Sequence, residues 1–136
     1  MRIKPEYPNI LKRQDLVYPK LSYEIVGAAF KVYNQLGWGH KESIYQKSFE
    51  NELKKSGIKF EREKLVSVKY NNQEVGRGFL DFVVDGRIVV EFKVMPKFGY
   101  IHINQVVGYL KSINLPLAIL IYFLKDGVKY RRILNK

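Results

Sequence analysis

Two acidic residues of this 136-residue chain stand inside apolar runs, Asp81 between residues 79 and 84 and Glu91 between residues 88 and 94. Taking an ionised carboxylate out of water is costly, so buried carboxylates are usually paired, protonated or bound to a cation. The pattern therefore makes both residues candidate metal ligands. The plainer alternative is that each points to a solvated face while its neighbours point inward, as strand alternation allows.

Lys93 favours the first interpretation. Residues 91 and 93 face the same side of a strand, so the Lys93 ammonium lies next to the Glu91 carboxylate. A simple salt bridge remains the alternative.

The two carboxylates share a site only in one strand register. A two-residue turn at residues 85–86 pairs Asp81 with Val90 and sends Glu91 to the opposite face. A three-residue loop at 85–87 pairs Asp81 with Glu91 and places both on one face. We predict the three-residue loop, or an equivalent bulge.

The elements that position these residues follow from the pattern of apolar side chains. Residues 1–20 contain three prolines and no sustained period, which predicts an irregular arm. From residue 21 a helix is expected, capped by Ser22 and ended by Gly37, with apolar positions Ile25, Ala28, Ala29, Val32 and Leu36. A second helix should begin near His40 or Lys41 and stop at residues 56–57.

Residues 58–94 are rich in Val, Ile, Phe and Tyr, with breaks at 71–72 and 85–86, which indicates three or four antiparallel strands. A third helix is expected over 100–113, then a strand at 117–124, a turn and a last short strand. The predicted fold is α/β (α+β), a mixed sheet flanked by helices, in one domain over residues 21–136.

Composition limits the partners and cofactors. Twenty-four Lys and Arg against thirteen Asp and Glu give a formal charge of +11, which points to nucleic acid first and an anionic membrane second. The longest apolar run, 117–124, is too short to span a bilayer and no signal peptide is recognisable, so we expect a cytoplasmic protein. With no cysteine and two histidines, a metal must be held by oxygen or imidazole and a three-histidine zinc site is impossible, which favours Mg²⁺ or Mn²⁺.

The order of motifs resembles a known family. Asp81 followed by 91–93 resembles the D…(D/E)xK signature of the PD-(D/E)XK nuclease superfamily, although Leu80 replaces the usual proline. Residues 39–45 match the pattern that gives the GxxExxY protein family its name, and Gln105 and Tyr109 reproduce a QxxxY motif. The resemblance covers about residues 21–134.

The resemblance implies a restriction-endonuclease-like fold and a metal-dependent nuclease that hydrolyses phosphodiester bonds, in DNA rather than RNA. It implies that Asp81 and Glu91 bind the cation directly, that the carbonyl of Phe92 adds an oxygen, and that Glu42 binds directly or through water. Lys93 would then orient or deprotonate the attacking water.

Gln105 and Tyr109 share a helix face, so both could reach the metal site or the scissile phosphate; a polar residue and an aromatic at a helix surface are the alternative. We expect Tyr45 in the core and give His102 little weight. Phosphate contacts are expected from an unspecified subset of Lys97, Lys111, Lys125, Lys129, Arg131 and Arg132.

Two other functions remain open at this stage. The first is a non-catalytic nucleic-acid-binding module on the same fold, which the intact carboxylates disfavour because they repel a polyanion in the absence of a metal. The second is a protein-interaction subunit built on exposed aromatics, and a homodimer stays open on the same grounds.

Overall fold

The computed structural model describes residues 17–99 and 102–135. A five-stranded sheet in the order β1-β2-β3-β4-β5 forms its centre. The strands are β1 (Phe60–Tyr70), β2 (Gln73–Val84), β3 (Ile88–Val94), β4 (Leu117–Leu124) and β5 (Gly127–Leu134), and the helices are α2 (Pro19–Leu36), α3 (Glu42–Lys55) and α4 (Ile103–Ile113). β3 and β4 are parallel and the other pairs are antiparallel. The predicted mixed sheet flanked by helices is confirmed.

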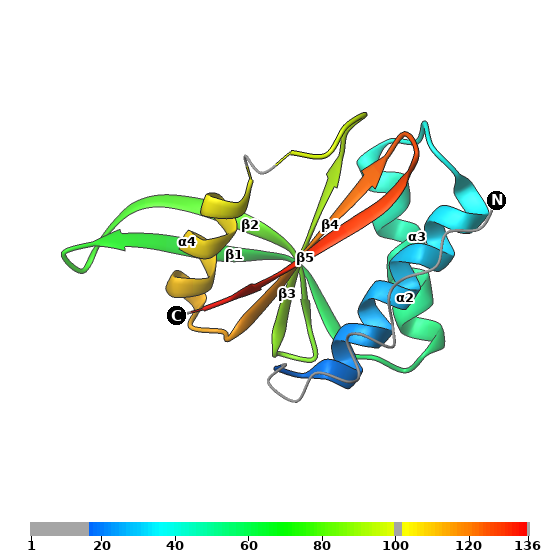
Figure 1. Cartoon of the computed structure of the whole chain (residues 1–136). Coiled ribbons are helices and arrows are strands. Elements are labelled where there is room, and N and C mark those ends of the chain that lie inside the picture. The colour runs from blue at the N-terminus through cyan, green and yellow to red at the C-terminus, as the bar shows by residue number, and fades with distance from the viewer. Residues whose placement is uncertain (1–16, 100–101, 136) are drawn as a thin grey trace.

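The helices cover opposite faces of the sheet, with α2 and α3 on one side and α4 on the other (Figure 1). β4 is buried along its whole length, which explains its unbroken apolar sequence. Its odd-numbered residues join the core beneath α2 and α3, and its even-numbered residues join the core beneath α4.

The start of the first helix was predicted wrongly. α2 begins at Pro19 with Tyr18 as the N-cap residue, and Ser22 is fully buried inside the helix instead of capping it. Proline is well suited to the first helical position, because its fixed φ matches the helix and its missing N–H is not needed there. Residues 19 and 20 of the predicted arm therefore belong to the helix, residues 17 and 18 directly precede it, and residues 1–16 lie outside the described residues.

The remaining elements lie close to their predicted positions. The end of α2 before Gly37, the bounds of α3, and the strand breaks at 71–72 and 85–86 are confirmed. α4 begins at Ile103, later than the predicted residue 100, and residues 100 and 101 lie outside the described residues. In the described parts of the chain, no helix is long and apolar enough to cross a membrane.

Candidate active site

The loop between β2 and β3 has the predicted three residues, 85–87. Val84 pairs with Ile88, and the first two loop residues have φ angles of 53° and 64°. An aspartate and a glycine, which occupy those positions, tolerate this left-handed conformation better than most residues. The same register brings Asp81 opposite Glu91, so the predicted register is confirmed.

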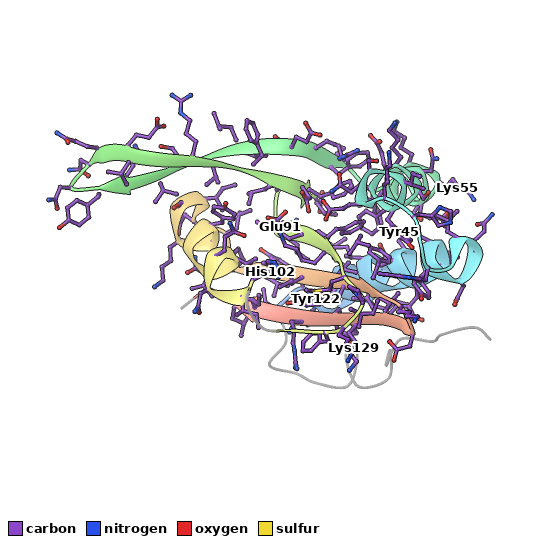
Figure 2. All side chains as sticks on the ribbon, turned by 90° about the horizontal axis from the view of Figure 1, so that it is seen from above. Tyr45, Lys55, Glu91, His102, Tyr122 and Lys129 are labelled. Atoms are coloured by element: carbon purple, nitrogen blue, oxygen red, sulfur yellow. The ribbon has the colours of Figure 1, made fainter. Side chains whose placement is uncertain are left out.

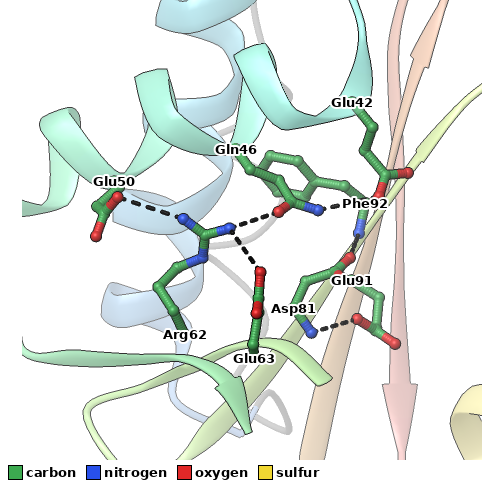
Figure 3. Close-up of polar contacts among 8 residues, drawn as sticks. All are labelled: Glu42, Gln46, Glu50, Arg62, Glu63, Asp81, Glu91 and Phe92. Atoms are coloured by element: carbon green, nitrogen blue, oxygen red, sulfur yellow. Dashed lines mark hydrogen bonds and ion pairs between the residues drawn. The ribbon is translucent and has the colours of Figure 1, made fainter. Parts of the chain in front are cut away.

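The two carboxylates bind to the backbone of each other's strands. The last described backbone pair between β2 and β3 on this side is Phe82 with Val90. Beyond it the Asp81 N–H donates to Glu91 Oε2 at 2.7 Å, and the Phe92 N–H donates to Asp81 Oδ2 at 2.8 Å (Figure 3). Side-chain oxygens thus take over from backbone carbonyls where the strands separate, which fixes the two carboxylates side by side.

The alternation of side chains along β2 changes at Asp81. Phe82 lies in the core beneath α2 and α3, whereas Leu80 lies in the core beneath α4. On β1 the matching irregularity is Glu63, which has a φ of 50° and separates the Arg62–Phe82 pair from the next pair. Beyond this point the β1–β2 hairpin projects past the rest of the sheet (Figure 1), so Asp81 marks the place where the hairpin leaves it.

Glu91 is an unusual carboxylate because it is only 4% exposed. Its burial, followed by the nearby Asp81 carboxylate, raises the pKa of Glu91 to about 8, against opposing effects of the Asp81 N–H and of Lys93. Two neighbouring carboxylates resist full ionisation in a buried place, and a cation between them would favour it.

Glu42 approaches the pair from the first turn of α3. Its burial and the Asp81 carboxylate raise the pKa of Glu42, while Lys93 lowers it. Glu42, Asp81 and Lys93 are therefore close enough to interact electrically, although they come from three different elements. The structure brings the predicted Glu42 to the predicted pair.

A chain of hydrogen bonds holds Glu42 in place (Figure 3). Gln46 Nε2 donates to Glu42 Oε2 at 3.0 Å, and Arg62 donates to Gln46 Oε1 at 2.6 Å and to Glu50 at 3.3 Å. Arg62 also lies over the Phe82 ring, 4.7 Å from its centroid. Sequence reasoning missed this support. Gln46 carried a signal, because it lies one helical turn after Glu42, but nothing in the sequence tied Arg62 to α3.

His102 lies nearer to the site than the sequence suggested. It is the N-cap residue of α4, and burial and then the Lys93 ammonium lower the pKa of His102. Its Nδ1 is buried and has no hydrogen-bond partner among the described residues. The only signal in the sequence was its place three residues before Gln105.

The other predicted site residues are linked less directly to the carboxylates. Gln105 is exposed on α4, and no described contact joins it to the carboxylates. Tyr109 packs against β2, where a Cβ atom added at Gly78 would lie 2.6 Å from its hydroxyl oxygen. Tyr45 is fully buried and stacks on Phe123 at 4.5 Å, as expected of a core residue.

The carboxylates of Glu42, Asp81 and Glu91 are oxygen ligands of the kind that a hard divalent cation prefers. Their side chains do not converge on one point in this structure. Among the described residues, no group of three or more carboxylates and histidines lies close enough together to hold a metal ion. In Asp81 and Glu91, one oxygen each accepts a backbone N–H. Burial first, and the Asp81 carboxylate second, nevertheless raise the pKa of both Glu42 and Glu91, and a bound cation would offset both effects.

The family of the chain follows from a comparison of its sequence with family models. Residues 19–133 match the model described as the PD-(D/E)XK nuclease superfamily. The chain belongs to this superfamily. The match spans every element from α2 to β5, so the superfamily's fold accounts for the whole described domain.

Comparison of structures gives more distant likenesses. The crystal structure of SSO0001 aligns with a TM-score of 0.57 and 19% identity, covering 98% of this chain and 69% of that one. An alkaline exonuclease (LHK-Exo) from Laribacter hongkongensis aligns with a TM-score of 0.46 and 8% identity, covering 96% and 76%. No curated protein matches the sequence of this chain. The likeness to SSO0001 concerns the fold alone.

Proposed function

We propose that this PD-(D/E)XK superfamily member is a nuclease that requires Mg²⁺ or Mn²⁺ and hydrolyses phosphodiester bonds, in DNA rather than RNA. The observation that carries the proposal is the reciprocal Asp81–Glu91 arrangement at the point where β2 and β3 separate. A purely structural ion pair would need one cationic partner, whereas here two carboxylates lie side by side with Lys93 next to them.

Each residue of the site has a separate proposed role. Asp81 and Glu91 hold the cation, the carbonyl of Phe92 adds an oxygen, and Glu42 binds it directly or through water. A bound divalent cation supplies an activated water and offsets the negative charge that builds up on the phosphate. Lys93 orients that water or accepts its proton, and it is close enough to Glu42 and Glu91 to affect the pKa of both.

We place Gln105 and Tyr109 beside the scissile phosphate as hydrogen-bond donors from α4. Support comes from the QxxxY spacing and from the position of the N-terminal end of α4, where His102 lies near Lys93. Membership in the narrower GxxExxY family belongs to the same proposal and rests on residues 39–45.

The decisive experiment measures cleavage of labelled single- and double-stranded DNA and RNA with Mg²⁺, with Mn²⁺ and with EDTA. We expect cation-dependent products from the wild type. The Asp81→Asn, Glu91→Gln and Lys93→Ala variants should each lose activity by about 10²- to 10⁴-fold, the usual contribution of a group acting in charge stabilisation or proton transfer.

Asp85→Asn is the matched control for Asp81→Asn. Asp85 is a carboxylate on the neighbouring loop, its side chain is 40% exposed, and it pairs only loosely with Arg87 at 3.6 Å. Activity should survive this change. Cleavage by Asp81→Asn at the wild-type rate, or a wild type inactive on every polymer with both cations, would contradict the proposed function.

A second candidate function has support from the β1–β2 hairpin, which exposes the apolar side chains of Leu65, Tyr70, Val75 and Phe79. Exposed apolar residues gathered on one element are typical of a protein-interaction surface or a homodimer contact. Sedimentation of the wild type and of a Leu65→Ser/Phe79→Ser variant tests this candidate. A monomer in both cases argues against a homodimer through the hairpin.

A further inference from the structure

Strand alternation sorts the basic residues of β5 between the two faces of the sheet. Lys129 and Arg131 are exposed and pair with Tyr122 and Leu120 of β4, so they lie on the face that carries α4. Arg132 takes the opposite face, where it donates to the Val17 carbonyl. The sequence alone left open which basic residues belong together, and the register of β5 now separates them.

The same face of the sheet carries Glu91 and Lys93 of the proposed active site, with the buried Leu120 and Tyr122 between them and β5. In the parallel pairing of β3 with β4, Glu91 lies beside Leu120 and Lys93 beside Tyr122. Two rows therefore run across the sheet, from Glu91 through Leu120 to Arg131 and from Lys93 through Tyr122 to Lys129. The labelled Glu91, Tyr122 and Lys129 follow one another in Figure 2. Adjacent strands are about 4.8 Å apart, so β5 lies roughly 10 Å from β3.

A single aromatic ring lies against both cations. Lys129 Nζ is 5.3 Å and Arg131 Cζ is 5.1 Å from the centroid of the Phe98 ring. Phe98 in turn packs edge-on against Tyr122, with centroids 4.7 Å apart. Cations over an aromatic face are attracted by its quadrupole, so Phe98 limits the freedom of two long side chains that would otherwise lose entropy on binding.

We propose that Lys129 and Arg131, positioned by Phe98, form a phosphate-binding track that receives the nucleic-acid backbone about three nucleotides from the cleaved bond. That distance is the roughly 10 Å between β3 and β5, taken as about three steps of 3.4 Å along the axis of a duplex that lies across the strands. The proposal rests on the proposed nuclease function, because it takes the carboxylate pair as the point of cleavage.

Charge complementarity favours a polyanionic backbone as the occupant. The carboxylates at Glu42, Asp81 and Glu91 repel a nucleic acid as it approaches, so the attraction must come from cations nearby. Lys129 and Arg131 supply it on the same sheet face without crowding the cleavage point. Binding through phosphates is independent of base sequence, so the track predicts affinity without sequence preference.

The test separates binding from cleavage. A fluorescein-labelled 20-nucleotide DNA, single- or double-stranded, is titrated with protein in EDTA, and binding is followed by anisotropy. The Lys129→Gln/Arg131→Gln variant should bind about tenfold or more weakly, as expected for two lost charged contacts. The slope of log affinity against log salt should fall by roughly 1.4 to 1.8.

Four further variants make the result specific. Lys54→Gln/Lys55→Gln removes the same charge from exposed residues of α3, on the other side of the sheet, and should bind like the wild type. Lys129→Arg/Arg131→Lys keeps the charge and should restore affinity. Phe98→Leu should weaken binding and Phe98→Tyr should restore it, because only the second keeps the ring. Thermal unfolding checks that each variant is folded.

Cleavage assays with two substrates complete the test. On the 20-nucleotide DNA the Lys129→Gln/Arg131→Gln variant should show a raised KM at little changed kcat, whereas on a small p-nitrophenyl phosphodiester, which is too short to reach β5, it should match the wild type. Equal binding by this variant and by Lys54→Gln/Lys55→Gln would overturn the track. Weakened binding by a protein that cleaves nothing would support the track and contradict the nuclease function, so the two failures are distinguishable.

Discussion

At the scale of single residues, the carboxylate pair combines unfavourable electrostatics with good hydrogen bonding. Asp81 and Glu91 each accept a backbone N–H from the opposite strand, which holds their oxygens in fixed directions. Their mutual repulsion is opposed by Lys93, but the pKa of Glu91 stays well above its ordinary value. Such an arrangement lowers folding stability, and this is common at sites that bind a charged ligand.

The pH dependence of stability should reveal Glu91. Because folding raises the pKa of Glu91 from 4.5 to about 8, folding favours the protonated form, and the stability that this gives is lost as the pH rises through that interval. In EDTA, the thermal unfolding temperature of the wild type should therefore fall relative to that of Glu91→Gln between about pH 5 and pH 8.

Glu74 provides a control of opposite sign. Hydrogen bonds from Ser67 and Arg77 lower the pKa of Glu74, so its contribution to stability is lost only as the pH falls below the ordinary range of glutamate. Glu74→Gln should track the wild type from pH 5 to pH 8. If the difference in thermal unfolding temperature between the wild type and Glu91→Gln does not change over that pH interval, Glu91 is already ionised in the folded protein.

At the scale of elements, features that depend on local sequence patterns were predicted better than features that depend on long-range contacts. A number sum left two registers open for the loop after β2, and the three-residue loop was predicted because only that register places Asp81 and Glu91 on one face. The start of α2 was missed because Ser22 looked like a cap while Pro19 looked like part of an arm. The Gln46–Arg62 link, the approach of His102 to Lys93 and the grouping of Lys129 with Arg131 depend on how elements pack, which residue spacing does not encode.

The packing of α4 against the β1–β2 hairpin has one close contact that can be tested. A methyl group at Gly78 would meet the Tyr109 ring, with the hydroxyl oxygen at 2.6 Å. Gly78→Ala should therefore displace the ring and cost about 1–3 kcal/mol of unfolding free energy, as overpacking usually does. Chemical denaturation measures this cost.

Two further variants show whether the contact is the cause. Gly76→Ala, two residues along the same strand, adds a methyl group with nothing within 4 Å and should not create the same clash. In a Tyr109→Ala background the extra cost of Gly78→Ala should disappear. A cost that persists there would place the effect in the backbone of β2 and not in the helix contact.

At the scale of the whole molecule, the candidate site lies in the sheet, between the helical layers on its two faces. α3 contributes Glu42 from one side, the end of α4 brings His102 from the other, and β2 and β3 separate between them. The whole chain has a formal charge of +11, and the proposed β5 track would assign two of its positive charges to the binding of phosphates. A group of carboxylates within a positively charged protein is suited to holding a cation next to a polyanion.

The most direct test of this site is calorimetric titration of the metal-free protein with Mn²⁺, because it does not depend on guessing the right nucleic acid. We predict saturable binding by the wild type and by Asp85→Asn, and its loss in both Asp81→Asn and Glu91→Gln, each of which should remain folded by thermal unfolding. Binding of Mn²⁺ by Asp81→Asn and Glu91→Gln as tightly as by the wild type would contradict the assignment of these carboxylates as the cation site.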